Sequence, residues 1–285
     1  RLQPNWFHQF MRQPQRFHPG TIMPGFWPGG KGVRPSILEG DPGGQIDALW
    51  QYLKRGREAR TPAGIRREPI PLLAGPDEAV MLRRAYKGIG KRGIGVGYPG
   101  RINLSFDAAR LRLGSIWSGD FGEMSGVWRG QGAGTVNERS REITRFPEGV
   151  AYAVLENREA AWPEEAGMEI RFRGYRLDRK RRPTFRYQIG GLSVEDGFLN
   201  ETHEGSVSLV RSLTFDRLPP MGLTLRLAAG KEVGDRSGPV FRVGPHLQIT
   251  AVGAFLRGEG ESRQLLLPLT EEEMVIRYKP VEDNQ

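Results

Sequence analysis

The most specific chemistry in the sequence belongs to the thioether of Met23. It lies in a segment dense in proline and glycine, His18-Pro19-Gly20-Thr21-Ile22-Met23-Pro24-Gly25-Phe26-Trp27-Pro28-Gly29-Gly30. Such a composition forbids regular structure, yet Ile22, Phe26 and Trp27 are too apolar for an idle surface loop. A methionine in this setting is by default a core filler. A thioether also serves as an axial ligand of haem iron and raises its reduction potential.

Gly88-Ile89-Gly90-Lys91-Arg92-Gly93 fits the dinucleotide-binding pattern G-x-G-x-x-G. That chemistry requires a strand before the glycines and a helix after them, because the pyrophosphate binds at the helix N-terminus. The next residues, Ile94 to Gly100, include three further glycines and a proline and cannot form a good helix. The pattern therefore favours a hairpin-rich β segment over a nucleotide site.

A second charged feature is the run Asp178-Arg179-Lys180-Arg181-Arg182-Pro183, which lies between two segments of alternating polarity. Four adjacent cations would suit a finger that contacts phosphates. No exposed aromatic residues interleave with them, so we expect an exposed hairpin loop whose charges protect the strand ends. No nucleic-acid partner is expected.

Other catalytic chemistry is weakly signalled. The four histidines, His8, His18, His203 and His246, show no metal-ligand spacing. Carboxylate pairs such as Glu164-Glu165, or Asp120 with Glu123, suit acid–base work only if they face each other. The chain has no cysteine, which excludes disulfides, thiol catalysis and thiolate metal sites within it.

The composition points to a folded, basic protein. Of the 285 residues 38% are hydrophobic, and the formal net charge is +9, which favours acidic partners unless it simply marks a solvated basic surface. No run of about 18 apolar residues is present, so no membrane span is expected. The chain starts at Arg1 without an initiator methionine and is expected to be a fragment or a processed product.

The elements that position these residues divide the chain. Helices are predicted from Pro4 to Pro14 and over 45–59, where Ile46, Leu49, Trp50 and Leu53 repeat at helical spacing. A proline-rich linker is predicted over 61–84. After residue 85 apolar residues alternate with a period of two between turn signals such as Gly190-Gly191 and Gly234-Asp235, which predicts an all-β, sandwich-like domain over 85–285.

The order of helix, Gly20-Thr21-Ile22-Met23-Pro24 loop and Gln45-Ile46-Asp47-Ala48-Leu49-Trp50-Gln51-Tyr52-Leu53 resembles the C-terminal half of a class I c-type cytochrome domain. In that family the loop methionine is the distal haem ligand and the final helix closes over the haem. The resemblance covers residues 1–60. It implies that Met23 ligates the iron of haem c, with Ile22, Phe26 and Trp27 as the apolar wall.

A second resemblance concerns the later residues. Gly93-Ile94-Gly95-Val96-Gly97-Tyr98-Pro99-Gly100, Leu104-Ser105-Phe106-Asp107, Gly126-Val127-Trp128 and Phe172-Arg173-Gly174-Tyr175-Arg176-Leu177-Asp178 look like the β region of large haem-binding proteins of PVC-type bacteria. Some of these relatives carry a dehydrogenase-like module. The sequence departs from the cytochrome pattern because Cys-x-x-Cys-His is absent, so haem c cannot be attached covalently to this chain.

The fold class expected is mixed and mainly β, with a short helical cytochrome-like remnant. The expected function is electron transfer, with the chain as the C-terminal part of a periplasmic or exported c-type cytochrome. Its expected partner is a redox protein or a dehydrogenase module, and we expect it to carry electrons rather than to be a catalyst itself. An alternative is a β-sandwich module that binds a glycan or a protein without redox activity, with Trp117 and Trp128 as stacking candidates. A third interpretation makes the β domain a carbohydrate-active enzyme.

Overall fold

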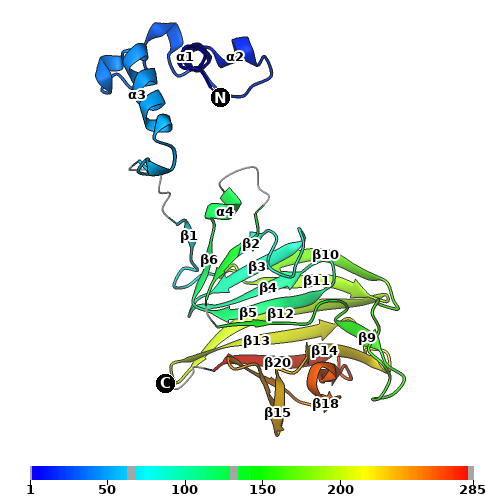
Figure 1. Cartoon of the computed structure of the whole chain (residues 1–285). Helices are drawn as coiled ribbons and strands as arrows, with labels where there is room; N and C mark the ends of the chain where they lie inside the picture. Colours follow the sequence, from blue (N-terminus) through cyan, green and yellow to red (C-terminus); the bar gives the residue numbers. More distant parts are fainter. Residues whose placement is uncertain (1, 63–68, 129–133, 141, 282–285) are drawn as a thin grey trace. The chain divides into compact units, whose positions relative to one another are not determined.

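The structure, a computed structural model, describes all residues except 1, 63–68, 129–133, 141 and 282–285. The chain forms two compact units, residues 1–68 and residues 69–285 (Figure 1). The first is helical and the second consists mainly of antiparallel strands. The predicted mainly β fold is confirmed.

The helical unit contains α1 (Pro4–Arg12), α2 (Pro14–Phe17), α3 (Pro42–Lys54) and the 3₁₀ turns η1 (Pro28–Gly30), η2 (Leu38–Gly40) and η3 (Gly56–Glu58). Pro14 ends α1 as predicted, because its ring cannot continue a helix, and it starts α2 instead. The Asp41 carboxylate caps α3 by accepting a hydrogen bond from the Gly44 amide. Phe7, Trp27 and Ile46 form the small core.

Four sheets build the second unit. An eight-stranded sheet has the order β10 (Ile170–Leu177), β11 (Pro183–Ile189), β12 (Leu192–His203), β13 (Ser206–Phe215), β20 (Glu273–Pro280), β17 (Leu247–Ala251), β16 (Val240–Val243) and β15 (Val233–Ser237). A five-stranded sheet has the order β2 (Val80–Arg83), β3 (Gly93–Tyr98), β4 (Ile102–Asp107), β5 (Arg112–Ser118) and β8 (Ile143–Arg145). A four-stranded sheet has the order β18 (Phe255–Arg257), β19 (Gln264–Pro268), β14 (Leu223–Ala229) and β9 (Tyr152–Val154). A three-stranded sheet has the order β1 (Pro71–Leu72), β6 (Asp120–Glu123) and β7 (Asn137–Arg139).

The arrangement is sandwich-like, because the eight-, five- and four-stranded sheets share one continuous core. Alternation supplies that core: Phe185, Tyr187 and Ile189 of β11 are all buried, while Arg186 between them is exposed. Beyond residue 85 the only described helices are α4 (Ser125–Trp128) and the 3₁₀ turn η4 (Gly260–Ser262).

Of the two turns predicted from glycine pairs, one is present in the structure and the other is not. Gly190 and Gly191, with φ of 53° and 81°, join β11 to β12 in the left-handed conformation that two-residue hairpins need. Gly234-Asp235 instead lies inside β15, so the turn predicted there is wrong.

The glycine-rich segment after residue 88 is explained by packing. Gly93, Gly95 and Gly97 lie in β3, with no helix after them. A Cβ atom at Gly95 would lie 2.1 Å from the Tyr86 hydroxyl oxygen, so only glycine admits that ring against the strand. Trp117 and Phe121 pack in the same cluster. The glycines of β3 therefore leave room for aromatic rings to pack against the strand, in agreement with the predicted β segment.

The main core also encloses an ion pair. Arg211 and Asp196 are 2% and 0% exposed, and two hydrogen bonds of 2.8 and 2.7 Å join them. The Tyr187 hydroxyl donates to the same carboxylate at 2.9 Å and lies 2.6 Å from the Tyr152 hydroxyl. A buried ion pair of this kind is tolerated because its charged groups are hydrogen-bonded to each other and to the surrounding hydroxyls.

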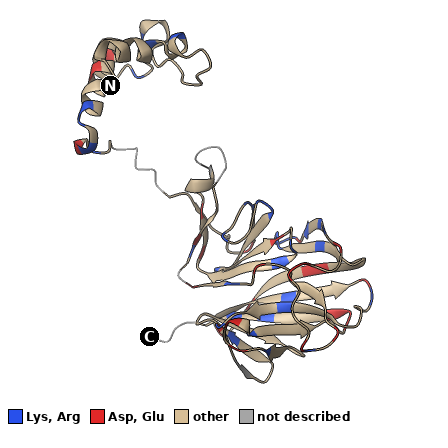
Figure 2. Ribbon diagram, turned by 45° about the vertical axis from the view of Figure 1, so that its right-hand side comes forward, with Lys and Arg blue, Asp and Glu red and all other residues tan. Residues whose placement is uncertain are grey.

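The boundary between the units falls within the predicted linker, 61–84. Residues 63–68 lie outside the described part, and the rest of that stretch already contributes β1 and β2, which pair with β6 and β3. Among the residues that the structure describes, no helix is long and apolar enough to cross a membrane. Acidic and basic residues are interspersed along the strands in the ribbon view of Figure 2.

Candidate functional site

The loop that carries Met23 is held by side chains of its own unit. The Thr21 hydroxyl accepts a hydrogen bond from the Met23 amide at 3.2 Å. From α2, the Gln15 side-chain amide donates to the Met23 carbonyl at 3.0 Å. Both polar groups of the Met23 backbone therefore have partners, and the half-buried side chain is presented from a fixed position although the loop has no regular structure.

Behind the loop, Trp27 and Gln45 form its internal support. Trp27 is 8% exposed, and its indole N–H donates to Gln45 Oε1 at 2.8 Å. The Gln45 amide in turn donates to the carbonyls of Ile37 and Arg34 at 2.7 and 3.1 Å. One side chain at the start of α3 thus ties together three parts of the unit. Sequence reasoning missed this role of Gln45.

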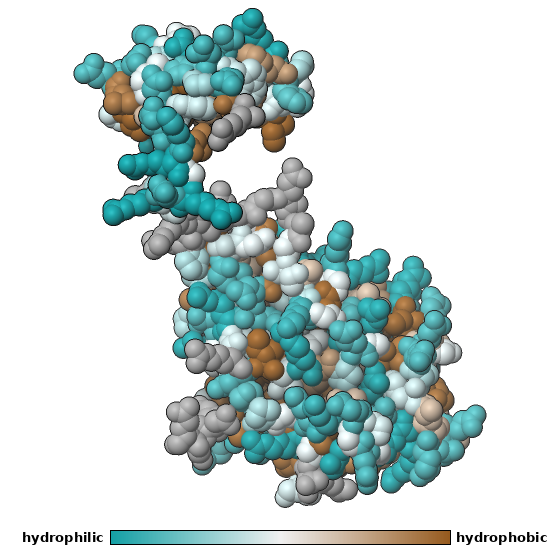
Figure 3. Space-filling model, viewed as in Figure 1, coloured by the Kyte–Doolittle hydropathy of each residue, from teal (hydrophilic) through white to brown (hydrophobic). Residues whose placement is uncertain are grey.

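Two large apolar side chains of the loop itself are exposed to solvent. Ile22 is 94% exposed and Phe26 is 41% exposed, whereas the neighbouring Trp27 is buried. Other exposed apolar side chains of this unit are Leu2, Trp6, Val33, Ile37, Leu38, Leu49 and Leu53. Figure 3 shows hydrophobic side chains on the surface of the helical unit. Exposed apolar side chains can contribute to a binding site where they lie together.

The predicted site residues are therefore divided. Ile22, Met23 and Phe26 lie together in sequence on the outer, partly or fully exposed side of the loop, while Trp27 packs against Phe7 and Ile46 in the core. The exposed Ile22 and Phe26 and the half-buried Met23 remain available for an apolar ligand, and Trp27 supports the loop from inside.

The tryptophans proposed for sugar stacking do not form a surface pair. Trp117 is 1% exposed in the cluster around Tyr86, and its N–H donates to the Asp120 carbonyl at 3.1 Å. The side chain of Trp128 lies outside the described part. Of the histidines, His8 bonds to Asp47 at 2.8 Å. In the described part of the chain, no three His, Asp or Glu side chains gather as metal ligands.

The charged loop between β10 and β11 is exposed over residues 178–181, as expected, whereas Arg182, which pairs with Asp178, is half-buried and Pro183 is buried. Asp178 accepts hydrogen bonds from the Lys180 and Arg182 amides and from the Arg182 guanidinium. Burial, which raises the pKa of Asp178, is slight and is outweighed by these bonds from Arg182 and Lys180, so that pKa lies below its ordinary value. Arg179 and Arg181 are exposed.

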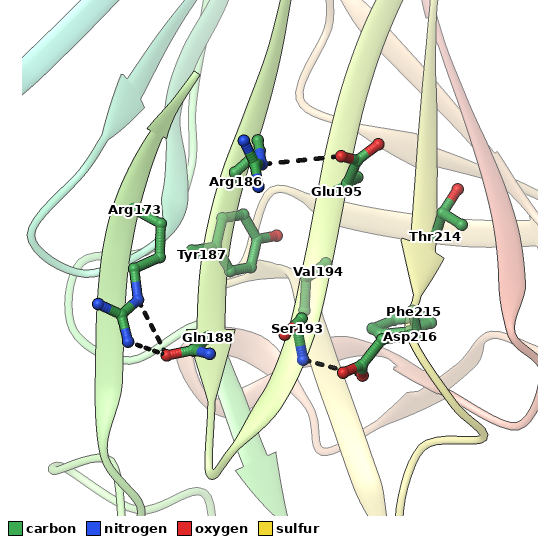
Figure 4. A pocket seen from close by; sticks show the side chains of 10 residues that line it. All are labelled: Arg173, Arg186, Tyr187, Gln188, Ser193, Val194, Glu195, Thr214, Phe215 and Asp216. Atoms are coloured by element: carbon green, nitrogen blue, oxygen red, sulfur yellow. Dashed lines mark hydrogen bonds and ion pairs between the residues drawn. The ribbon is translucent and has the colours of Figure 1, made fainter. Parts of the chain in front are cut away.

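A polar groove of about 510 Å³ lies on the outer face of β10 to β13 (Figure 4). The side chains that line it alternate with the core residues of the same strands. The polar ones are Arg173, Arg186, Gln188, Ser193, Glu195, Thr214 and Asp216. Arg186 Nε lies 3.7 Å from Glu195, and Asp216 accepts a hydrogen bond from the Ser193 amide at 3.0 Å.

A β-bulge places the most unusual of these side chains. The register of β10 against β11 shifts between Phe172 and Gly174, and Arg173 is the extra residue. Gly174, with φ of 117°, supplies a backbone conformation that other residues rarely adopt. Arg173 Nε and Nη2 both donate to Gln188 Oε1, at 2.9 and 2.5 Å. Bulges commonly direct a side chain in this way beside binding sites.

The sequence does contain a signal for this groove, namely arginine at every second or third position of Ile170–Leu177. The denser charge of the Asp178–Pro183 loop is the stronger signal in the sequence, and it lies outside the groove. Comparisons with family models, curated proteins and solved structures gave no match. The structure shows a mainly β, sandwich-like unit with a polar groove, and a small helical unit with several exposed apolar side chains.

Proposed function

We propose that residues 1–60 are the methionine-bearing half of a c-type haem domain and that the protein takes part in electron transfer. The observation that carries this proposal is the Met23 loop, whose backbone is fixed by Thr21 and Gln15 while Ile22 and Phe26 beside it face water. A haem would cover such apolar side chains. The proposal includes a periplasmic or exported location and a redox protein or dehydrogenase module as the partner.

The residues present fit a haem in part. Met23 supplies the thioether ligand, and Ile22 and Phe26 supply an apolar wall that would exclude water from the iron. Haem c would provide the one-electron chemistry when bound. The Cys-x-x-Cys-His attachment motif, which includes the proximal histidine, is absent from these 285 residues, so the haem would have to be attached to another segment or partner.

A haem peptide with a covalently attached haem, one histidine ligand and an open sixth position tests this directly. Added to the 285-residue chain, it should acquire the sulfur-to-iron charge-transfer absorption of a methionine-ligated haem and a higher reduction potential. Met23→Ala should abolish both changes. Met221→Ala is the matched control, because Met221 is 97% exposed in the other unit. Absence of the band, or its loss in the Met221 variant, would contradict the proposal.

The groove on β10 to β13 favours a second function, the binding of a glycan by the β unit. Its hydroxyl, amide and charged side chains are the groups that hydrogen-bond sugar hydroxyls, and it lies open on a rigid sheet. Retention of the protein on an immobilised polysaccharide in affinity electrophoresis tests this role. Migration unchanged by every polysaccharide offered would contradict it.

A further inference from the structure

Arginines are concentrated on the outer face of β10 and β11, in and beside the groove, whose own lining holds two arginines and two carboxylates. Three arginines of β10 belong to the outer face: Arg171, opposite Gln188 in the register, Arg173 at the bulge, and Arg176, opposite Thr184. Arg186 of β11 joins them. In the described part of β10 to β13, the carboxylate that pairs with this group is Glu195, at 3.0 Å from Arg176 and 3.7 Å from Arg186. Asp216, the second carboxylate of the groove, pairs with Arg217 at 3.5 Å, so the four arginines of this face meet two anions, Glu195 and Asp216.

Two of these arginines have no carboxylate partner among the described residues, namely Arg171 and Arg173. Arg173 is held by a neutral amide, since both of its hydrogen bonds go to Gln188 Oε1. Its guanidinium is thereby oriented without being neutralised. Its remaining N–H groups can still donate to an oxyanion, and a guanidinium recognises a carboxylate by two parallel hydrogen bonds.

Neutral polar groups lie beside the cations. Gln188, Ser193 and Thr214 line the same groove. In Figure 4, Gln188 and Ser193 lie between Arg173 and Asp216, and Thr214 lies on the next strand beyond Glu195. Hydroxyl and amide groups at this spacing suit a ligand that carries several hydroxyls. The groove is open rather than enclosed, so it suits a chain that runs across the strands better than a small molecule that must be surrounded.

The aromatic residues of these strands argue against single-stranded nucleic acid. Phe185, Tyr187, Phe198 and Phe215 are buried, and Phe172 and Tyr175 pack against the same core. Single-stranded nucleic acids are held largely by stacking of bases on exposed aromatic rings. A polyhydroxylated anion, by contrast, needs only the cations and hydroxyls that this face offers.

From these observations we infer that the groove on β10 to β13 binds an acidic polysaccharide, a polymer of uronic acid residues whose carboxylates bind Arg173 and Arg186. The inference rests on the proposed glycan-binding role of the β unit and adds the class of glycan. It is independent of the haem proposal.

Polygalacturonate and its fully methyl-esterified form are the matched probes, because they share one sugar backbone and differ in charge. Affinity electrophoresis of the whole chain should show retardation by polygalacturonate and at least about tenfold weaker binding of the ester, the loss expected when charge-assisted hydrogen bonds are removed. Binding should weaken as salt is raised. Equal binding of both polymers would overturn the acidic class while leaving a glycan-binding role. Binding of neither would overturn both.

Arg173→Ala/Arg186→Ala should lower the affinity for polygalacturonate about tenfold or more. Arg179→Ala/Arg181→Ala removes the same charge from the neighbouring exposed loop and should change the affinity less than about twofold, since long-range charge is screened. If the first double variant does not fold, the single variants Arg173→Ala and Arg186→Ala give the same readout, because each side chain is exposed and lines the groove. Equal losses in groove and loop variants, or tighter binding of a single-stranded oligonucleotide than of polygalacturonate, would overturn the inference.

Discussion

At the scale of single residues, the buried pair of Asp196 and Arg211 is the most sensitive point of the β unit. Asp196→Ala would leave the Arg211 guanidinium in the core with only hydroxyl partners, and breaking a buried pair in this way costs about 3–5 kcal/mol. Urea unfolding followed by circular dichroism measures the loss.

The matched control is Asp120→Ala, which breaks a pair with Arg101 at 2.9 Å between side chains that are 39% and 72% exposed. Exposed pairs contribute about 0–1 kcal/mol, so this variant should unfold almost as the parent does. Equal destabilisation by the two substitutions would show that the buried pair contributes no more to the free energy of unfolding than the exposed pair.

The identity of the buried residues could be predicted only in part at this scale. The alternating pattern places Tyr187 inside β11, but it also places Asp196 and Arg211 inside, at positions where a sequence pattern expects apolar residues. Only the three-dimensional pairing shows that each satisfies the other. The same holds for Gln45, whose partners lie 8, 11 and 18 residues away.

At the scale of elements, the packing of β3 depends on its glycines, which leave space for the Tyr86 ring. Gly95→Ala would place a Cβ atom 2.1 Å from the Tyr86 hydroxyl, and forcing the buried ring to move should cost about 1–3 kcal/mol or more. Thermal unfolding measures this cost. Gly90→Ala is the control, because a Cβ there meets no atom within 4 Å. A Gly95 variant as stable as the Gly90 variant would refute the packing explanation.

The loop between β10 and β11 should behave in the opposite way. Arg179→Glu/Arg181→Glu reverses two exposed charges that have no ion-pair partner in the described part of the chain. The free energy of unfolding should change by no more than about 0.5 kcal/mol, as at ordinary surface sites. Chemical denaturation of the double variant measures it, and a loss of several kcal/mol would show that the loop is structural.

The elements themselves were largely predictable, because local rules determine them. Pro14 ends the first helix, and period-two alternation marks β11, β14 and β20. The order of strands was not predictable, since β13 pairs with β20 across about sixty residues and β10 gains its groove-facing arginine from a bulge. The Met23 ligand role remains a prediction that the haem-peptide experiment addresses.

At the scale of the whole molecule, buried tyrosines link stability to pH. Tyr86, Tyr98, Tyr152, Tyr187 and Tyr278 are each at most 2% exposed. Burial is the main cause that raises the pKa of each hydroxyl above its ordinary value near 10. The folded state therefore keeps these protons at a pH where the unfolded chain releases them.

The sign of the effect follows from this difference. As pH rises past about 10, the unfolded state binds fewer protons than the folded state, so the free energy of unfolding decreases with pH. Below that value the tyrosines are neutral in both states and make no pH-dependent contribution. We expect the β unit to unfold cooperatively in alkali, with the tyrosinate absorbance and the loss of the β circular dichroism signal rising together. Ionisation of the five tyrosines near pH 10 while the sheets stay folded would contradict this, because it would require hydroxyls that solvent reaches in the native sandwich.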